Sequence, residues 1–198
     1  MSDIIIRLEE EKDYRIVEEI TRAAFSYPGR VERGGIGCPF EHWMVHALRK
    51  QDGITDLSYV AEVNNIIVGH IIYSNARVET NDDKIVHVLN FGPLSVHPDY
   101  QKLGIGKALM NATIAKATEL GFGAILFFGR PEYYPQFGFV EAEQYGITDS
   151  GGENFPAFMA MELKKGYLEN VQGKFYESTI YDDSLNRDSV LEYDKAFR

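Results

Sequence analysis

Two periods of apolar and polar residues recur along the chain and predict a mixture of strands and helices. Stretches rich in β-branched and aromatic residues predict strands at 4–8, 57–63, 66–78, 86–96, 124–128 and 155–163. Asn64-Asn65 predicts a tight hairpin between the second and third of these strands. Gly92-Pro93 interrupts the fourth and predicts a bulge or a splayed edge, because proline has no N–H for a ladder hydrogen bond.

Apolar residues spaced three and four apart predict helices between these strands. The first helix covers 13–25, with an apolar face of Ile16, Val17, Ile20 and Ala24. The second begins at Phe40 and ends before Gly53. The third begins at Gly104 and ends at Gly121, with an apolar face of Ile105, Ala108, Leu109, Ala112, Ala115 and Leu120. Since this helix joins two strands, a right-handed crossover between parallel strands is expected. A separate short helical segment is predicted at 132–137.

The glycine-rich loop before the third helix is the strongest candidate for chemistry. Its sequence is Gln101-Lys102-Leu103-Gly104-Ile105-Gly106-Lys107. The first N–H groups of a helix have no partner within the helix, and with the positive end of the helix dipole they favour a phosphate or pyrophosphate. A dinucleotide-binding loop requires Gly or Ala where Leu109 stands, and a P-loop requires Ser or Thr where Ala108 stands. We therefore expect the loop to hold the diphosphate of another coenzyme.

A longer pattern, Val96-x-Pro98-x-x-Gln101-x-x-Gly104-x-Gly106-x-Ala108-Leu109, resembles the acyl-CoA-binding motif of the GNAT superfamily of N-acetyltransferases. Residues 66–70 are similar to the third strand of that family. The string Gly129-x-Pro131-x-Tyr133-Tyr134-x-x-Phe137-Gly138-Phe139 resembles a bacterial branch of predicted acetyltransferases with mostly unassigned substrates. The resemblance covers 4–163. It implies an α/β (α+β) fold, with a central mixed, mostly antiparallel sheet that contains a splayed parallel strand pair and is flanked by helices.

The resemblance also implies a reaction, the transfer of an acetyl group from acetyl-CoA to a primary amine by direct attack. Acetyl-CoA is the expected cosubstrate, and no metal is expected. The residues implied to hold it are Leu94, Ser95 and Val96 along the pantetheine arm, and Gln101, Lys102, Leu103, Gly104, Ile105, Gly106 and Lys107 around the pyrophosphate. Tyr134 is the implied general acid for the departing thiolate, with Tyr133 as its competitor.

The residue that deprotonates the amine is left open between Glu79, His87 and Glu132. Cys38, His42 and His46 lack the Glu of an H-E-x-x-H motif, so they are expected to be partly exposed helix residues rather than a metal site. Arg130 is expected to cap a turn. The loop 30–38 is expected to shape the amine pocket.

Composition narrows the possible partners and compartment. The formal net charge of −10 argues against nucleic-acid binding and mildly favours a cationic substrate, whether a small-molecule or a peptide amine. No apolar run is long enough to span a membrane, the N-terminus lacks a signal peptide, and Cys38 is the only cysteine, so a cytoplasmic protein is expected.

Residues 1–163 are predicted to form the acetyltransferase domain, with 164–198 as an extension packed on it that adds a strand or wraps irregularly. A homodimer is possible on this sequence. Two other functions stay open, a CoA-binding sensor without turnover and a nucleotide-binding protein.

Overall fold

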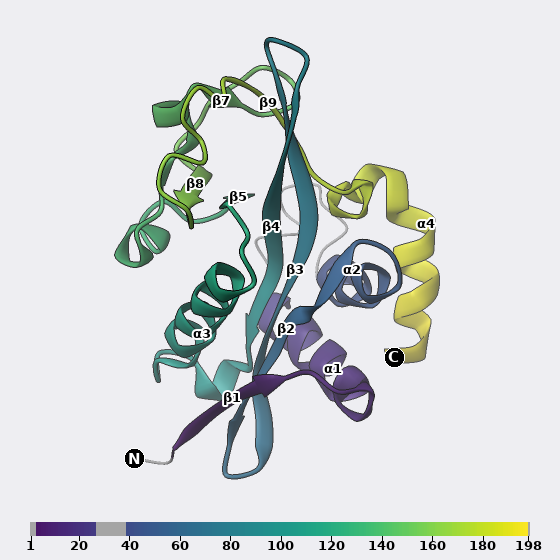
Figure 1. The fold of residues 1–198 in the computed structure, drawn as a ribbon. Coiled ribbons are helices and arrows are strands. Elements are labelled where there is room, and N and C mark those ends of the chain that lie inside the picture. The colour runs from purple at the N-terminus through teal and green to yellow at the C-terminus, as the bar shows by residue number, and fades with distance from the viewer. Residues whose placement is uncertain (1–2, 27–38, 198) are drawn as a thin grey trace. The chain divides into compact units, whose positions relative to one another are not determined.

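A computed structural model describes residues 3–26 and 39–197 (Figure 1). The longer elements are β1 (Ile4–Leu8), α1 (Tyr14–Phe25), α2 (Pro39–Lys50), β2 (Gly53–Val63), β3 (Ile66–Thr80), β4 (Ile85–Val96), α3 (Ile105–Glu119), β5 (Ala124–Phe128), β8 (Phe158–Glu162), β9 (Gly173–Tyr176) and α4 (Asp183–Asp194). Two two-residue strands, β6 (Val140–Glu141) and β7 (Ile147–Thr148), and several single 3₁₀ turns complete the described chain.

The described strands form one sheet in the order β1-β2-β3-β4-β5-β8-β6, with β9 pairing with both β3 and β7. β1 with β2, β3 with β9, and β8 with both β5 and β6 are antiparallel. The pair β4–β5 is parallel, with Leu89 and Ile125 as Cα partners, and so is the short pair β7–β9. This mixed, mostly antiparallel sheet with flanking helices confirms the predicted fold class.

The hairpin between β2 and β3 forms where the sequence predicts it. Asn64 and Asn65 have φ angles of 52° and 62°, the left-handed conformation that a two-residue hairpin turn requires at both positions. Asparagine tolerates this conformation better than most residues because its short polar side chain bonds locally. On its other edge β2 pairs with β1, where Ile6 lies opposite Ala61.

The chain divides into two compact units, each made of separate stretches of sequence. The first contains Met1–Ile72, Gly92–Ala112 and Thr179–Arg198, and the second contains Tyr73–Phe91 and Thr113–Ser178. Each unit takes chain from both sides of residue 163, so the division into a 1–163 domain and a 164–198 extension stays a prediction. The C-terminal stretch does add a strand, because β9 pairs with β3.

The core of the first unit lies between its helices and the sheet. Val17 of α1, Leu48 of α2 and Ile72 of β3 are buried together with two residues from the C-terminal stretch, Ile180 and Val190. Ile16, which the periodicity placed on the apolar face of α1, is 38% exposed. The prediction for Ile16 was wrong because the buried face of α1 is set by Val17, Ile20 and Thr21.

A buried ion cluster, which we call the Arg49 network, ties the first unit together. Arg49 Nη1 lies 2.6 Å from Glu18 Oε1, and Arg49 Nη2 lies 2.5 Å from Glu9 Oε1. Ser58 Oγ donates to Glu9 Oε2 at 2.7 Å, and His70 Nε2 lies 3.4 Å from Glu9 Oε1. Since all five side chains are almost completely buried, each charge depends on its partners rather than on water.

Within the first unit, a second polar cluster holds α4 to α1 and α2. Arg22 Nε donates to Asp194 Oδ1 at 2.8 Å, and His42 Nε2 lies 3.3 Å from the same oxygen. Tyr193 and Phe197 pack their rings against His42, at centroid distances of 5.5 Å and 4.4 Å. Burial lowers the pKa of His42 to about 4, with Asp194 opposing this shift, so the ring is neutral at pH 7.

The second unit has its own core on one face of its strands. Val88 of β4, Leu126 of β5, Phe158 of β8 and Phe175 of β9 are buried in one cluster. The returning strand β8 is shorter than predicted, because Phe155 and the two residues after it precede it as a turn. The helical segment predicted at 132–137 is a single 3₁₀ turn over Tyr134–Phe137, since Pro135 removes one backbone donor.

The apolar face of α3 also differs from the prediction. The buried positions are Ile105, Leu109, Met110, Thr113 and Ala117, whereas Ala115 and Leu120 are exposed. Alanines at several positions around the helix made the buried face hard to choose from apolar spacing alone.

Candidate functional site

The glycine-rich loop joins β4 to α3 within the first unit. Two of its residues have left-handed backbone conformations, Lys102 with φ of 63° and Gly104 with φ of 86°. A Cβ built on Gly104 would meet no atom within 4 Å, so the space beside this residue is open. The side chains of Lys102, Leu103 and Lys107 are exposed, whereas Ile105 is buried and anchors the start of the helix.

The backbone donors of this loop have no acceptor among the residues that the structure describes. The first hydrogen bond of α3 runs from Ala108 N to Gly104 O, at 2.9 Å. Within 3–26 and 39–197, no hydrogen bond is donated by the backbone N–H groups of residues 102–107. A run of such donors at a helix N-terminus, beside open space, is the arrangement that binds pyrophosphate. The loop therefore fits the group that the sequence predicts for it.

Two hydrogen bonds near the end of β4 show which backbone groups face β3 and which face the opposite edge, here called the outer edge of β4. His97 N donates to Val68 O of β3 at 2.8 Å, so the backbone of His97 faces β3. Because successive residues of a strand face opposite edges, the backbone of Ser95 also faces β3 and those of Leu94 and Val96 face away. Gln101 Nε2 donates to Val96 O at 3.2 Å on this outer edge. The outward groups of β4 are thus those of Leu94 and Val96.

Close packing holds the loop and this strand end in place. Ser95 is fully buried, and its Oγ donates to Thr21 Oγ1 of α1 at 2.9 Å. A Cβ added to Gly69 of β3 would lie 2.9 Å from Ile105 Cγ2 and 3.1 Å from Ser95 O. Only glycine therefore lets β3 approach the start of α3 so closely. The predicted residues 94–96 and 101–107 are brought together by these contacts within the first unit.

Tyr134 lies in the second unit, inside a group of aromatic rings. Its ring meets Phe127 edge-on at a centroid distance of 4.5 Å, and it also contacts Phe91 at 5.7 Å and Phe139 at 6.0 Å. A Cβ on Gly129 would lie 2.5 Å from Tyr134 Cε2, so glycine at this position makes room for the ring. The string of residues 129–139 thus folds around Tyr134.

The hydroxyl of Tyr134 is held in its protonated form. Burial is the main cause that raises its pKa above the usual range, the neighbouring Tyr133 adds to the shift, and Arg130 opposes it. Among the described residues, no hydrogen-bond partner is found for this hydroxyl. Burial also raises the pKa of Tyr133, whose side chain is half-buried.

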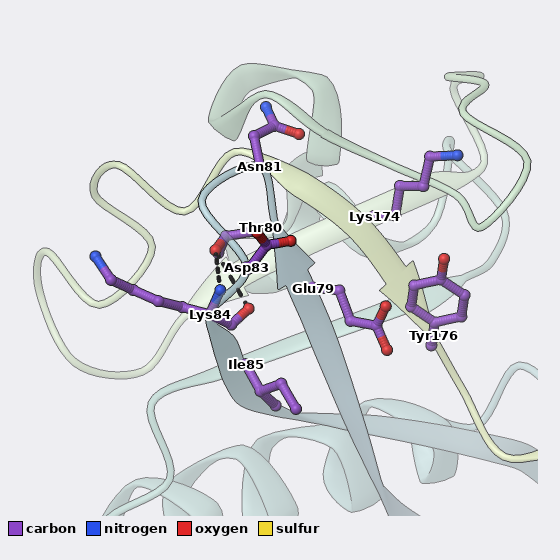
Figure 2. Close-up of a pocket in the computed structure, with 8 residues that line it drawn as sticks. All are labelled: Glu79, Thr80, Asn81, Asp83, Lys84, Ile85, Lys174 and Tyr176. Atoms are coloured by element: carbon purple, nitrogen blue, oxygen red, sulfur yellow. Dashed lines mark hydrogen bonds between the residues drawn. The ribbon is translucent and has the colours of Figure 1, made fainter.

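The three candidate bases lie in different surroundings. Glu79 accepts a hydrogen bond from Arg77 at 2.9 Å and lines an open pocket of about 440 Å³ with Lys174 and Tyr176 (Figure 2). His87 is exposed, and its carbonyl accepts a hydrogen bond from Tyr167. Glu132 is exposed. None of these surroundings distinguishes one candidate as the base.

Other predicted features are settled only in part. The loop 30–38 and Cys38 lie outside the described residues. His46 is partly exposed as predicted, but His42 is fully buried, and the prediction for His42 was wrong because α4 covers it. The Arg130 carbonyl accepts from Tyr133 N at 3.0 Å and so caps the turn.

In the described ranges no three His, Cys, Asp or Glu side chains converge as a metal site, and no helix there could span a membrane.

Residues 55–141, which include the loop and Tyr134, match the family model of the acetyltransferase (GNAT) domain. In this stretch the chain carries an acetyltransferase (GNAT) domain. The chain is 33% identical over 102 residues to the uncharacterized N-acetyltransferase YjhQ of Escherichia coli K12. That match covers 51% of each chain, so this chain spans about half the length of the relative that it matches.

Solved structures of other GNAT proteins share the fold. The enzyme YhbS of Escherichia coli, solved in complex with CoA, superposes with a TM-score of 0.78 at 21% identity, over 92% of this chain and 93% of its own. A GNAT acetyltransferase of Brucella melitensis, solved with acetyl-CoA, gives a TM-score of 0.69 at 24% identity, over 92% and 100% of the two chains. These likenesses show that the GNAT fold extends well beyond residues 55–141.

One polar pair in this GNAT fold was not found by sequence reasoning. Asn90 Nδ2 donates to Glu177 Oε2 at 2.6 Å, and Asn90 is almost fully buried. The two residues are 87 positions apart, and neither belongs to a local motif. Glu177 could have been found only from the pairing of β9 with β3, because this pairing decides where the residue after β9 lies.

Proposed function

We propose that this protein is an N-acetyltransferase that moves an acetyl group from acetyl-CoA to a primary amine by direct attack. The observation that carries the proposal is the run of unsatisfied N–H groups over residues 102–107 at the start of α3. The match to the GNAT domain and the fold of the CoA-bound relatives agree with it.

The loop would bind the pyrophosphate through its backbone. N–H groups and the helix dipole supply positive potential without a metal, which matters in a chain with a formal charge of −10. Gln101 would help by keeping Val96 O engaged, so that the strand end and the loop move as one piece. The pantetheine arm would lie along the outer edge of β4, bonding to Leu94 and Val96 rather than to Ser95, whose backbone faces β3.

Acetyl-CoA supplies a thioester carbonyl that an uncharged amine can attack. The new N–C bond replaces the C–S bond, one proton leaves the nitrogen, and one proton is taken up by the thiolate. Tyr134 Oη would hydrogen-bond to the sulfur as it becomes negative. The pKa of Tyr134 lies above its usual range, whereas a thiol titrates at about 8.5. Complete transfer of a proton from the Tyr134 hydroxyl to the thiolate is therefore uphill when this hydroxyl acts alone. Proton loss from the amine must therefore accompany it.

Calorimetry separates this function from a nucleotide-binding protein. The full chain should bind acetyl-CoA and CoA with similar affinity and should not bind ATP at the same concentrations, because the loop lacks the P-loop residues. Tight ATP binding without CoA binding would overturn the proposal. Release of free thiol in the presence of an amine then separates an enzyme from a CoA-binding sensor.

The role of Tyr134 is tested with a neighbouring tyrosine as the control. Tyr134→Phe should lower kcat by about 10²-fold or more while the affinity for acetyl-CoA changes less than twofold. Tyr133→Phe removes a hydroxyl from the adjacent, half-buried ring and should keep most of the activity. If Tyr133→Phe were the inactive variant, the assignment of the two tyrosines would be reversed.

A further inference from the structure

The side chain of Tyr134 is held by aromatic rings rather than by a hydrogen bond. Phe127 meets it edge-on at a centroid distance of 4.5 Å and an interplanar angle of 77°, and Phe139 does so at 6.0 Å and 81°. Both phenylalanine side chains are almost completely buried. Within residues 3–26 and 39–197 the Tyr134 hydroxyl has no hydrogen-bond partner, so the packing of the rings decides where this hydroxyl points.

The backbone at Gly129, next to these rings, is held in place by the sheet. Gly129 directly follows β5, and its N–H donates to the carbonyl of Ala157 at 2.8 Å. The preceding residue, Phe128, is the Cα partner of Phe158 in the antiparallel pair β5–β8. An atom added at Gly129 would therefore displace neighbouring side chains rather than the strand.

Two rings occupy the space beside Gly129. A Cβ built on Gly129 would lie 2.4 Å from Phe127 Cε2, 2.5 Å from Tyr134 Cε2 and 2.9 Å from Tyr134 Cδ2. Carbon atoms in ordinary contact are about 3.5–4.0 Å apart, so a ring would have to move by about 1 Å. Tyr134 has more room to turn, because it is half-buried whereas Phe127 is 1% exposed. Since Gly129 does not have a positive φ, ring packing and not backbone conformation favours glycine there.

We propose that Gly129 is a positioning residue for the general acid, because its missing side chain lets the Tyr134 ring lie where its hydroxyl is productive. The inference rests on the proposed function and adds to it a residue that acts through Tyr134 alone. A misplacement of about 1 Å can slow an enzymatic step by about 10²-fold. The loss should appear in kcat and not in the affinity for acetyl-CoA, since the loop of residues 102–107 belongs to the first unit and Gly129 to the second.

The test compares Gly129→Ala with another glycine of the second unit that lies against a tyrosine. A Cβ on Gly123 would lie 2.3 Å from three ring atoms of Tyr167, which packs against the core of the unit. Gly123 also does not have a positive φ, so Gly123→Ala makes the same chemical change and the same kind of clash away from Tyr134.

Turnover is measured as thiol release from acetyl-CoA, and affinity for acetyl-CoA by calorimetry. The acceptor is whichever of spermidine, 2-phenylethylamine and an alanine tripeptide the wild type acetylates fastest. Gly129→Ala should lower kcat about tenfold or more and change the affinity less than about twofold, whereas Gly123→Ala should change neither by more than about twofold. An equal fall in kcat for both variants would overturn the inference.

A double variant shows whether Gly129 acts through the Tyr134 hydroxyl. Adding Gly129→Ala to Tyr134→Phe should lower kcat by less than about twofold, since the group that Gly129 positions is already absent. A further fall of about tenfold would overturn the inference, because a general weakening of the fold acts whether or not the hydroxyl is present.

A second variant covers the case in which Gly129→Ala does not fold. Phe127→Leu removes Cε2, the atom nearest to the added Cβ, so Phe127→Leu combined with Gly129→Ala relieves this contact while Tyr134 must still move. The combined variant should have a kcat about tenfold or more below that of Phe127→Leu alone. Equal kcat values would overturn the inference, and circular dichroism shows that each variant is folded.

Tyr134→Phe distinguishes a failure of this inference from a failure of the proposed function. If the wild type released no thiol, or if Tyr134→Phe kept the wild-type kcat, the proposed function or its general acid would be wrong, and the inference with it. If Tyr134→Phe lost activity and Gly129→Ala kept it, the proposed function would stand and only the role of Gly129 would be wrong.

Discussion

The loop of residues 102–107 and the Arg49 network both belong to the first unit, and they treat polar groups in opposite ways. In the network, Arg49 is matched by Glu9 and Glu18, and every charge is buried with its partner. In the loop, a run of N–H groups is left without acceptors in the described chain and lies beside open space at Gly104. In the network the polar groups bond to one another, whereas in the loop the N–H groups remain available to bind a ligand.

This difference separates stability from binding. A buried charge that loses its partner destabilises the fold, because neither water nor another group replaces the partner. An exposed backbone donor that loses its orientation costs little stability, since water can bond to it in either conformation. Changes in the network should therefore alter unfolding, and changes in the loop should alter the affinity for acetyl-CoA.

The largest effect is expected from Arg49→Met, which leaves two buried carboxylates without their cation. The free energy of unfolding should fall by about 3–5 kcal/mol in urea denaturation. Arg77→Met removes an exposed arginine paired with Glu79 and should cost less than about 1 kcal/mol. A stable Arg49→Met protein with weakened acetyl-CoA binding would contradict the division of roles.

Acid should weaken the network in a defined range of pH. Burial alone would raise the pKa of Glu9, but His70 and Arg49 outweigh it and lower the pKa from 4.5 to about 2. The unfolded chain then binds a proton before the folded chain does. The stability that Glu9 contributes is complete above pH 4.5 and is lost as the pH falls to about 2, by roughly 3 kcal/mol.

Unfolding measured between pH 5 and pH 2 tests this range. Glu9→Gln should be less stable than the wild type at pH 6 and should lose less stability on acidification. Equal slopes for the two proteins between pH 4.5 and pH 2 would show that Glu9 does not titrate there.

In the loop, Gly104→Ala should weaken acetyl-CoA binding by about tenfold or more. A side chain at φ of 86° is strained by about 1–2 kcal/mol, and relief of this strain would turn the N–H groups. Gly121→Ala is the matched control, because Gly121 has φ of 85° at the far end of α3. Both variants should lose similar stability, and only the first should bind acetyl-CoA less tightly in calorimetry.

The smallest effect concerns the exposed charge of Lys107. Lys107→Gln should weaken acetyl-CoA binding about two- to threefold at low salt, and the difference should vanish near 0.5 M salt because the charge is screened. Lys116→Gln, on the same helix and paired with Glu119, should leave the affinity unchanged. A loss that persisted at high salt would mean that Lys107 does more than add charge.

Local patterns in the sequence predicted most of the sheet and the backbone of the candidate site. The Asn64-Asn65 turn, the loop before α3 and the strands β1 to β5 depend on neighbouring residues, and the structure has them close to where the pattern placed them. The strand β8 is shorter than predicted, and the short strands β6 and β7 were not predicted. The backbone donors of the loop could be predicted because a helix N-terminus leaves them unpaired wherever it occurs. The family resemblance was also confirmed, since residues 55–141 match the GNAT domain.

Contacts between distant segments could not be predicted. His42 was expected to be partly exposed, and it is buried because a helix about 140 residues later covers it. Glu177 reaches Asn90 across 87 positions, and Arg49 finds Glu9 across 40. Such pairings follow from how the sheet is assembled, and no periodicity in a short window records them.

The contact between Arg22 and Asp194 has a consequence for how the protein is made. The two residues are 172 positions apart, and Val190 of α4 fills the core beside Val17 of α1. A chain emerging from the ribosome therefore has its first helices long before the segment that completes their core. Until residues near 194 have been synthesised, the apolar faces of α1 and α2 stay partly uncovered, and during that interval a chaperone or aggregation competes for them.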